Sequence, residues 1–97
     1  MDYEIVLAPE AADDLRALDA RHRANVVAAL ERHLRHEPSK VSRSRIKRLR
    51  GLRRPQYRLR VDEYRVFYDV VEMTVQILAI VHKPEAERWL RQFGEIE

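Results

Sequence analysis

The chain has 97 residues, of which 45% are hydrophobic, so we expect one domain with one modest core over residues 1–97. It has no cysteine, which excludes a disulfide framework, a thiolate metal site and a cysteine nucleophile. The N-terminal MDYEIVLAPE has neither the basic nor the apolar region of a signal peptide, and no apolar run approaches the about 20 residues of a membrane span. We therefore expect a cytoplasmic protein with no membrane partner.

Positive charge is concentrated in one stretch. Ten of the 19 lysines and arginines lie between Lys40 and Arg60, in KVSRSRIKRLRGLRRPQYRLR, which has no acid. The other nine stand against all 16 acids, which gives the rest of the chain a net charge of −7. Apolar residues interleave with the basic ones, which argues against a disordered tail, the alternative for such a run. A basic patch on an acidic body indicates a polyanionic partner, most commonly nucleic acid.

The first half of the chain is predicted to form a strand and two helices. Residues 3–7, YEIVL, are apolar and β-branched, as in a strand. Pro9 suits the first turn of a helix, and Asp19 suits the N-cap of a second helix that ends by Pro38. Joined by two or three residues, the helices form an αα-hairpin. Three histidines fall in this hairpin: His22, His33 and His36. A metal site there has no obvious third ligand, so we interpret them as surface residues.

The second half has the two-residue period of β-strands. Residues 44–49 alternate weakly and fit either a strand or an extended loop, with Gly51 and Pro55 marking turns around it. Three successive strands with short connections follow, at residues 57–61, 64–71 and 74–82. The last of them is nearly all apolar, as a central strand covered on both faces would be.

The chain is expected to end in an amphipathic helix. Pro84 suits its first turn, and its apolar anchors are Trp89, Leu90 and Phe93. The order of elements predicts an α+β fold, with an N-terminal strand and αα-hairpin, an antiparallel-rich sheet of four to five strands, and a C-terminal helix. We expect the helices to cover one face of the sheet.

The alternation of side chains along a strand predicts where the arginines point. Arg58 and Arg60 point away from the core. A turn at residues 62–63 places Arg60 opposite Arg65 and Arg58 opposite Phe67. Like charges directly opposite each other destabilise a sheet, so folding alone does not explain this arrangement. A bound phosphodiester does, because arginine matches phosphate oxygens and an aromatic face stacks on a base. The structural alternative is that Asp69 and other acids neutralise the arginines.

Several segments of the sequence resemble a known protein family, which composition alone does not reveal. RIKRLRG, YRLRVDEYRVFYDV, ILAIVHK and the amphipathic C-terminal helix resemble the RelE type of the RelE/ParE superfamily, toxins of bacterial type II toxin-antitoxin systems. The resemblance covers nearly the whole chain, and YRLR…YRVFYDV is its most specific part. It implies a RelE-like fold and a ribosome-dependent endoribonuclease, or mRNA interferase, that cuts messenger RNA in the ribosomal A site and inhibits translation. It further implies that no metal or other cofactor is needed and that a cognate antitoxin holds the toxin in check in a hetero-oligomer.

The resemblance also implies site residues. RelE-type proteins have basic residues at the positions of Arg58, Arg60, Arg65 and Lys83. His82 is the one histidine near them and is suited to acid/base work, its alternative being an ordinary strand-end histidine. Arginine holds its proton too tightly to act as a base, so the arginines suit charge stabilisation and RNA positioning. The expected RNA-binding residues are basic or aromatic: Lys47, Arg48, Arg50, Arg53, Arg54, Phe67 and Trp89.

Two other functions fit the sequence. A ParE-like inhibitor of DNA gyrase has a similar fold and does not cut RNA, but the arginine-rich pair of strands favours the ribonuclease. A catalytically weak member would only bind RNA, ribosomes or its antitoxin. Trp89 favours this third function, because it stands where RelE-type proteins have a tyrosine and it has no hydroxyl for proton transfer.

Overall fold

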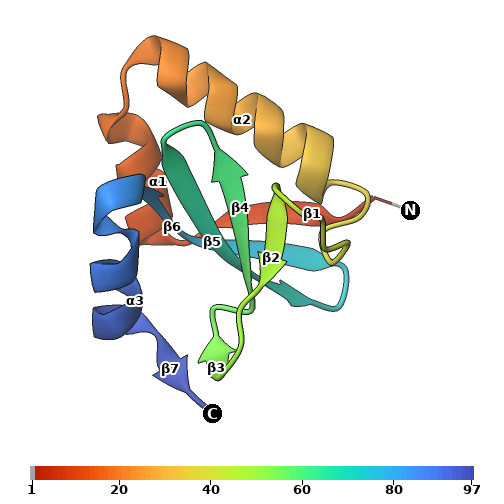
Figure 1. Cartoon of the computed structure of the whole chain (residues 1–97). Coiled ribbons are helices and arrows are strands. Elements are labelled where there is room, and N and C mark those ends of the chain that lie inside the picture. Colours follow the sequence, from red (N-terminus) through yellow and green to blue (C-terminus); the bar gives the residue numbers. More distant parts are fainter. Residues whose placement is uncertain (1) are drawn as a thin grey trace.

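The computed structural model describes residues 2–97. In this range the chain forms a five-stranded sheet, three α-helices and a separate pair of short strands (Figure 1). The elements are β1 (Glu4–Leu7), α1 (Pro9–Ala17), α2 (Ala20–Leu34), β2 (Ile46–Arg48), β3 (Leu52–Arg54), β4 (Tyr57–Val61), β5 (Tyr64–Val71), β6 (Thr74–His82), α3 (Ala86–Phe93) and β7 (Glu95–Ile96). A 3₁₀ turn, Lys83–Glu85, joins β6 to α3. The α+β fold predicted from the sequence is confirmed.

The αα-hairpin begins and ends where its sequence predicts. Pro9 lies in the first turn of α1, where the missing backbone N–H costs no hydrogen bond. Asp19 is the N-cap of α2, and its carboxylate accepts a hydrogen bond from the backbone N–H of His22 at 2.8 Å. α2 ends at Leu34, before Pro38.

The sheet has the order β1–β6–β5–β4–β2. β1 runs parallel to the first part of β6, and the other three pairs are antiparallel. β2 resolves the ambiguity of residues 44–49, because Ile46–Arg48 pairs with β4 while the residues around it form bends. The connections β4–β5 and β5–β6 are the predicted two-residue turns, since Val61 lies opposite Tyr64 and Val71 opposite Thr74.

The core lies between α1, α2 and one face of the sheet. Val26, Leu30 and Leu34 of α2 are buried against apolar side chains of the strands. The fully buried Tyr68 of β5 crosses this layer, and its hydroxyl donates to the carbonyl oxygen of Pro38 at 2.7 Å. Burial of the hydroxyl raises the pKa of Tyr68 well above its usual value.

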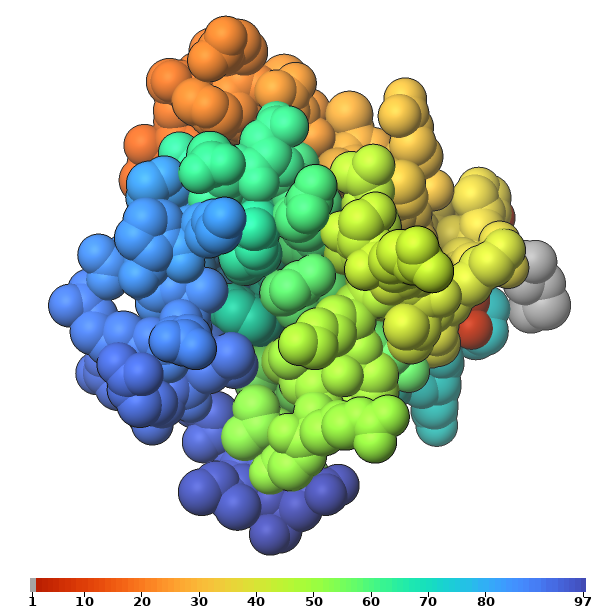
Figure 2. Space-filling view, viewed as in Figure 1, coloured from red at the N-terminus to blue at the C-terminus, as the bar shows by residue number. Residues whose placement is uncertain are grey.

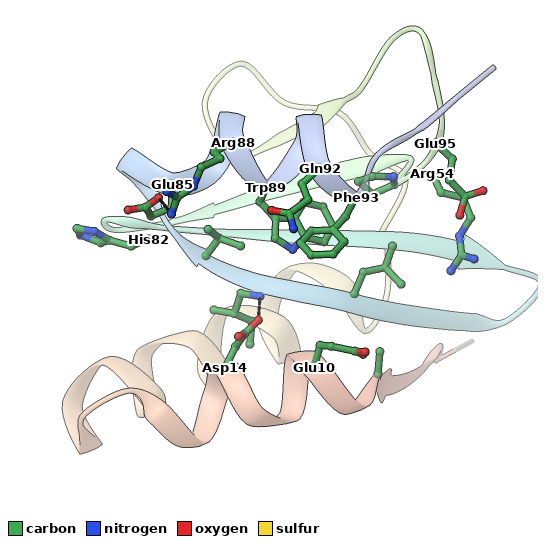
Figure 3. Close-up of a pocket in the computed structure, with 15 residues that line it drawn as sticks. Glu10, Asp14, Arg54, His82, Glu85, Arg88, Trp89, Gln92, Phe93 and Glu95 are labelled. Carbon is green, nitrogen blue, oxygen red and sulfur yellow. Dashed lines mark hydrogen bonds and ion pairs between the residues drawn. The ribbon is translucent and has the colours of Figure 1, made fainter.

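The expectation that all helices cover one face of the sheet is wrong. α1 lies on one side of the sheet and α3 on the other, as Figure 3 shows. The reason is in the alternation of β5, in which Tyr68 points into the core and the adjacent Phe67 points to the opposite face. Trp89 of α3 packs against Phe67 and so holds α3 on that opposite face.

The short strands β3 and β7 were not predicted. They form an antiparallel pair that joins the loop after β2 to the end of the chain. The side chain of Arg53 in β3 donates to the carboxylate of Glu95 in β7 at 2.8 Å. Such short, polar strands have no hydrophobic period that a sequence pattern would reveal.

Candidate nucleic-acid interface

Four cations of β2, β4 and β5 point away from α1 and α2 and form a surface that we call the arginine face: Lys47, Arg58, Arg60 and Arg65. Arg60 lies directly opposite Arg65, and Arg58 lies between Lys47 and Phe67. These are the pairs that alternation and the turn at residues 62–63 predicted. Figure 2 shows β4 and β5, in green, exposed between α3, in blue, and the yellow-green segment around β2.

The arginine face is partly desolvated. Arg65 is only 8% exposed, and its Nη1 donates to the carbonyl oxygens of Asp62 and Tyr64 at 3.0 and 2.9 Å. Burial lowers the pKa of Arg65, and the nearby Arg60 lowers it further. Burial also lowers the pKa of Arg58, and the charges of Arg65 and Arg60 lower it further. The guanidinium groups therefore lie close enough to repel one another.

The arginine face has a buried donor with no acceptor. Within residues 2–97, Arg58 Nε is buried and has no hydrogen-bond partner. In the same range no carboxylate forms an ion pair with Arg58, Arg60 or Arg65. A buried donor left unpaired costs about 1–3 kcal/mol. An anion bound here would therefore supply the missing acceptor for Arg58 Nε and offset the positive charge of the arginine face.

Asp69 does not neutralise the arginine face. Its buried carboxylate accepts from Arg54 Nε and from the backbone N–H of Gln56, both at 2.7 Å. Asp69 therefore neutralises Arg54 and not the arginines of the arginine face. Arg54 thus has a structural partner within the chain, and its contact with RNA stays a prediction.

Phe67 is on the arginine face but is not open to a ligand. Its side chain is fully buried, because the indole ring of Trp89 stacks on it. The expectation that Phe67 stacks on an RNA base is therefore wrong. Trp89, which is half-buried, is the ring that α3 presents at this edge of the face.

His82 lies away from the arginine face. It pairs opposite Tyr64, whereas Val81 pairs opposite Arg65. The rings of His82 and Tyr64 are 5.4 Å apart, and Tyr64 is 5.2 Å from the ring of His22 on α2. His82 thus belongs to the face that α2 covers, and its expected catalytic place beside the arginines is wrong.

Lys83, the residue after His82, lies beside the turn between β4 and β5. Its backbone N–H donates to the carbonyl oxygen of Glu63 at 2.7 Å. This places the start of the 3₁₀ turn next to the end of the arginine face that Arg60 and Arg65 occupy.

The other predicted RNA-binding cations are dispersed. The guanidinium of Arg48 lies over the ring of Tyr57, 5.1 Å from its centroid, and Tyr57 stacks on Tyr68 in the core. Arg48 is therefore on the α2 side of the sheet, and its expected place in the RNA site is wrong. Arg50 is exposed in the loop before β3, and Arg53 is paired with Glu95.

A groove of about 640 Å³ lies between α1 and α3, as Figure 3 shows. Its floor is β6 beyond Ile77, where the pairing with β1 ends. Asp14 of α1 accepts a hydrogen bond from the Ile80 backbone N–H at 3.0 Å, and burial raises the pKa of Asp14. In the sequence, this groove is indicated only by the predicted lengths of the strands. The first strand is shorter than the last and so cannot pair along all of it.

No metal cluster or membrane helix is found in the described part of the chain. Within residues 2–97, no three His, Cys, Asp or Glu side chains gather closely enough to hold a metal ion. None of the helices in this range has the length and apolar character that crossing a membrane requires.

Comparison with known protein families identifies the class of protein to which the chain belongs. Residues 5–87 match the family model described as ParE toxin of type II toxin-antitoxin system, parDE. The chain belongs to this family, within the RelE/ParE superfamily, and is a toxin of a type II toxin-antitoxin system. No curated protein has a significant match to the chain.

Solved structures share this fold. The RelBE2 toxin-antitoxin complex from Mycobacterium tuberculosis is 28% identical, with a TM-score of 0.66 over 84% of this chain and 99% of that chain. The RelE-RelB complex from Pyrococcus horikoshii is 23% identical, with a TM-score of 0.70 over 86% and 97% of the two chains. The complex from Methanococcus jannaschii is 20% identical, with a TM-score of 0.67 over 87% and 96%.

Proposed function

We propose that this toxin is a ribosome-dependent mRNA endonuclease and that the arginine face binds the RNA at the cleaved phosphate. Arg58 carries the proposal. Its buried Nε has no acceptor, Lys47, Arg60 and Arg65 are its cationic neighbours, and within residues 2–97 no carboxylate forms an ion pair with it. A phosphodiester supplies both an acceptor and opposite charge, and arginine binds phosphate oxygens in a fixed fork.

The arginines act by stabilising charge. In the cleavage the RNA 2′-hydroxyl attacks the adjacent phosphorus, forms a 2′,3′-cyclic phosphate and breaks the bond to the 5′-oxygen. Negative charge grows on the phosphate oxygens as the 2′-proton passes to a water molecule, the acceptor in this proposal because the arginines cannot act as the base. Arg58, Arg60 and Arg65 face those oxygens and hold this charge, a role that requires no proton transfer by arginine.

The leaving 5′-oxygen must gain a proton, and Lys47 is the side chain we assign to this step. Lys47 pairs directly opposite Arg58, so its ammonium group lies on the arginine face. An ammonium can donate a proton, whereas a guanidinium holds it too tightly. His82 has no role in this chemistry, because it lies on the other face of the sheet.

We propose further that a cognate antitoxin covers two surfaces of the toxin. The solved relatives are toxin-antitoxin complexes, which supports such a partner. The arginine face suits acidic side chains. The groove between α1 and α3 suits an extended, apolar segment, because β6 beyond Ile77 has no neighbouring strand on that edge within residues 2–97 and lies beside the exposed Phe93. Folding of an antitoxin segment onto both surfaces would block RNA.

The second candidate function is inhibition of DNA gyrase. The observation in its favour is the match to the ParE family model, together with the absence of histidine from the arginine face. In that case the same cations would serve contacts with gyrase or its DNA, and transcripts would stay intact.

The test is primer extension on a reporter transcript after the toxin is induced alone. Wild type and His82→Ala are expected to give new breaks inside translated codons. Arg58→Gln is expected to reduce the breaks about 100-fold, as loss of one transition-state donor does. The charge-matched control is Arg21→Gln, an exposed residue of α2 away from the arginine face, and it should cut normally.

Lys47→Arg separates charge from proton transfer. It keeps the positive charge, so RNA binding should persist while cleavage falls. Cleavage at the wild-type rate in Lys47→Arg would exclude Lys47 as the acid. Arrested growth with intact transcripts and broken DNA would overturn the nuclease and support gyrase as the target.

A further inference from the structure

A second cationic surface lies at the edge of the sheet, where α2 approaches the segment before β2. Two adjoining hollows of about 370 and 310 Å³ are found there, and three side chains line both of them: Arg32, His33 and Arg45. We call this surface the edge groove. Figure 1 shows α2 and β2 side by side at this edge.

Two of the cations that line the edge groove, Arg32 and Arg45, form no ion pair within residues 2–97, whereas Lys40 at its rim pairs with Glu37. Arg32 and Arg45, which lie near His33, therefore keep positive charges that no carboxylate in this range pairs with. The neighbouring cations Arg35 and His36 do have acidic partners, Glu31 and Asp2.

The backbone holds Arg45 in place. The hydroxyl oxygen of Ser42 accepts from the backbone N–H groups of Arg45 and Ile46, both at 3.0 Å. On the other side, the backbone N–H of Arg60 donates to the carbonyl oxygen of Arg45 at 2.9 Å. Arg45 is therefore fixed next to Arg60, and the edge groove begins where the arginine face ends.

We infer that the edge groove binds a phosphodiester of an RNA backbone, at a site separate from the cleaved phosphate. Arg32 and Arg45 donate to the phosphate oxygens from two elements, and a ring N–H of His33 donates between them. No Phe, Tyr or Trp lines either hollow, so the contact is with the backbone and not with a base. The edge groove adjoins the arginine face, so an RNA strand bound there as proposed can continue into it, and the peptide competitor below tests the acidic alternative.

His33 gives the site its own spectroscopic signal. Burial lowers the pKa of His33, and the charges of Arg45 and Arg32 lower it further. A phosphate placed between the arginines offsets their charge, so binding should raise the His33 pKa. The other titratable or charged groups that line the two hollows are His36, Glu37, Lys40 and Asp62.

Binding is tested with the full-length toxin and a short blunt RNA duplex by fluorescence anisotropy. The groove variant is Arg32→Gln with Arg45→Gln. The charge-matched control is Arg21→Gln with Arg43→Gln, two exposed residues that line neither hollow. The groove variant should bind about tenfold more weakly than the control, and its salt slope should be about 1–2 lower, for one or two lost phosphate contacts. Equal losses in the two variants would overturn the inference.

The second readout is the His33 ring signal followed by NMR across pH. The duplex should raise the His33 pKa in wild type and in the control variant but not in the groove variant. A poly-glutamate peptide that displaces the duplex from the groove at equal charge would overturn the assignment to RNA and give the groove to an acidic protein segment. Because no ribosome is present, these results do not depend on whether the toxin cuts RNA.

Discussion

The indole ring of Trp89 lies almost parallel to the phenyl ring of Phe67, with 4.9 Å between the ring centroids and 3° between the planes. No residue of α3 is fully buried, and Phe93 at its end is 55% exposed. The stack therefore attaches α3 to the sheet through one aromatic contact with β5.

Trp89→Ala should lower the free energy of unfolding by about 1–3 kcal/mol, less than the about 3–5 kcal/mol of a fully buried tryptophan. Urea denaturation followed by far-UV circular dichroism measures this loss. Trp89→Phe keeps a stacked ring and should lose much less. Phe93→Ala is the exposed control, and a loss as large as that of Trp89→Ala would contradict the role given to the stack.

Arg58→Met should make the toxin more stable and less active. The substitution removes an unpaired buried donor and a repulsive charge while it keeps an unbranched side chain of similar length, so we expect a gain of about 1 kcal/mol in the free energy of unfolding. RNA cleavage and binding should fall in the same protein. Arg21→Met on exposed α2 is the control. A destabilised Arg58→Met protein would show that the chain already satisfies this arginine.

Asp14 should make stability fall as pH rises. Burial raises its pKa in the folded toxin above the ordinary value of 3.8, so the folded state holds this proton more tightly than the unfolded state. The contribution is full below pH 3.8 and is lost as pH rises through the folded pKa. Asp14→Asn retains an acceptor for the Ile80 N–H and should remove this part of the pH dependence. Urea denaturation across that pH range checks it, and an unchanged profile would refute it.

Tyr68→Phe should cost about 1–3 kcal/mol of unfolding free energy. The lost hydroxyl leaves the carbonyl oxygen of Pro38 without its buried donor. Tyr64→Phe is the matched control, because no hydrogen bond from the Tyr64 hydroxyl is part of the structure within residues 2–97. Thermal unfolding of the two variants should therefore separate clearly, and equal midpoints would argue against the Tyr68–Pro38 bond.

Local patterns were enough to predict the main elements of the fold. Pro9 and Asp19 mark helix starts that depend only on neighbouring backbone groups, and the paired residues Arg60 and Arg65 follow from strand alternation and a two-residue turn. The side of the sheet that α3 covers was not predictable in this way. It depends on the contact between Trp89 and Phe67, which are far apart in the sequence.

The site was predicted less well, for the same reason. The sequence correctly predicted that the arginines of β4 and β5 lie on one face, because the alternation of side chains along the two paired strands determines it. His82 was misplaced because the register of the β5–β6 pair shifts between Phe67 and Tyr68, which turns the end of β6 over relative to regular alternation and places His82 opposite Tyr64. The ion pair between Arg54 and Asp69 and the unpaired state of Arg45 both depend on how distant segments meet.

β2 has a consequence for self-association. It is the outer strand on its side of the sheet, it has three residues, and two of them are Lys47 and Arg48. A second copy that added its own β2 here would bring like charges against each other, so the sheet cannot grow by repeating itself at this edge. The positive charge of β2 thus opposes edge-to-edge aggregation of the toxin at high concentration.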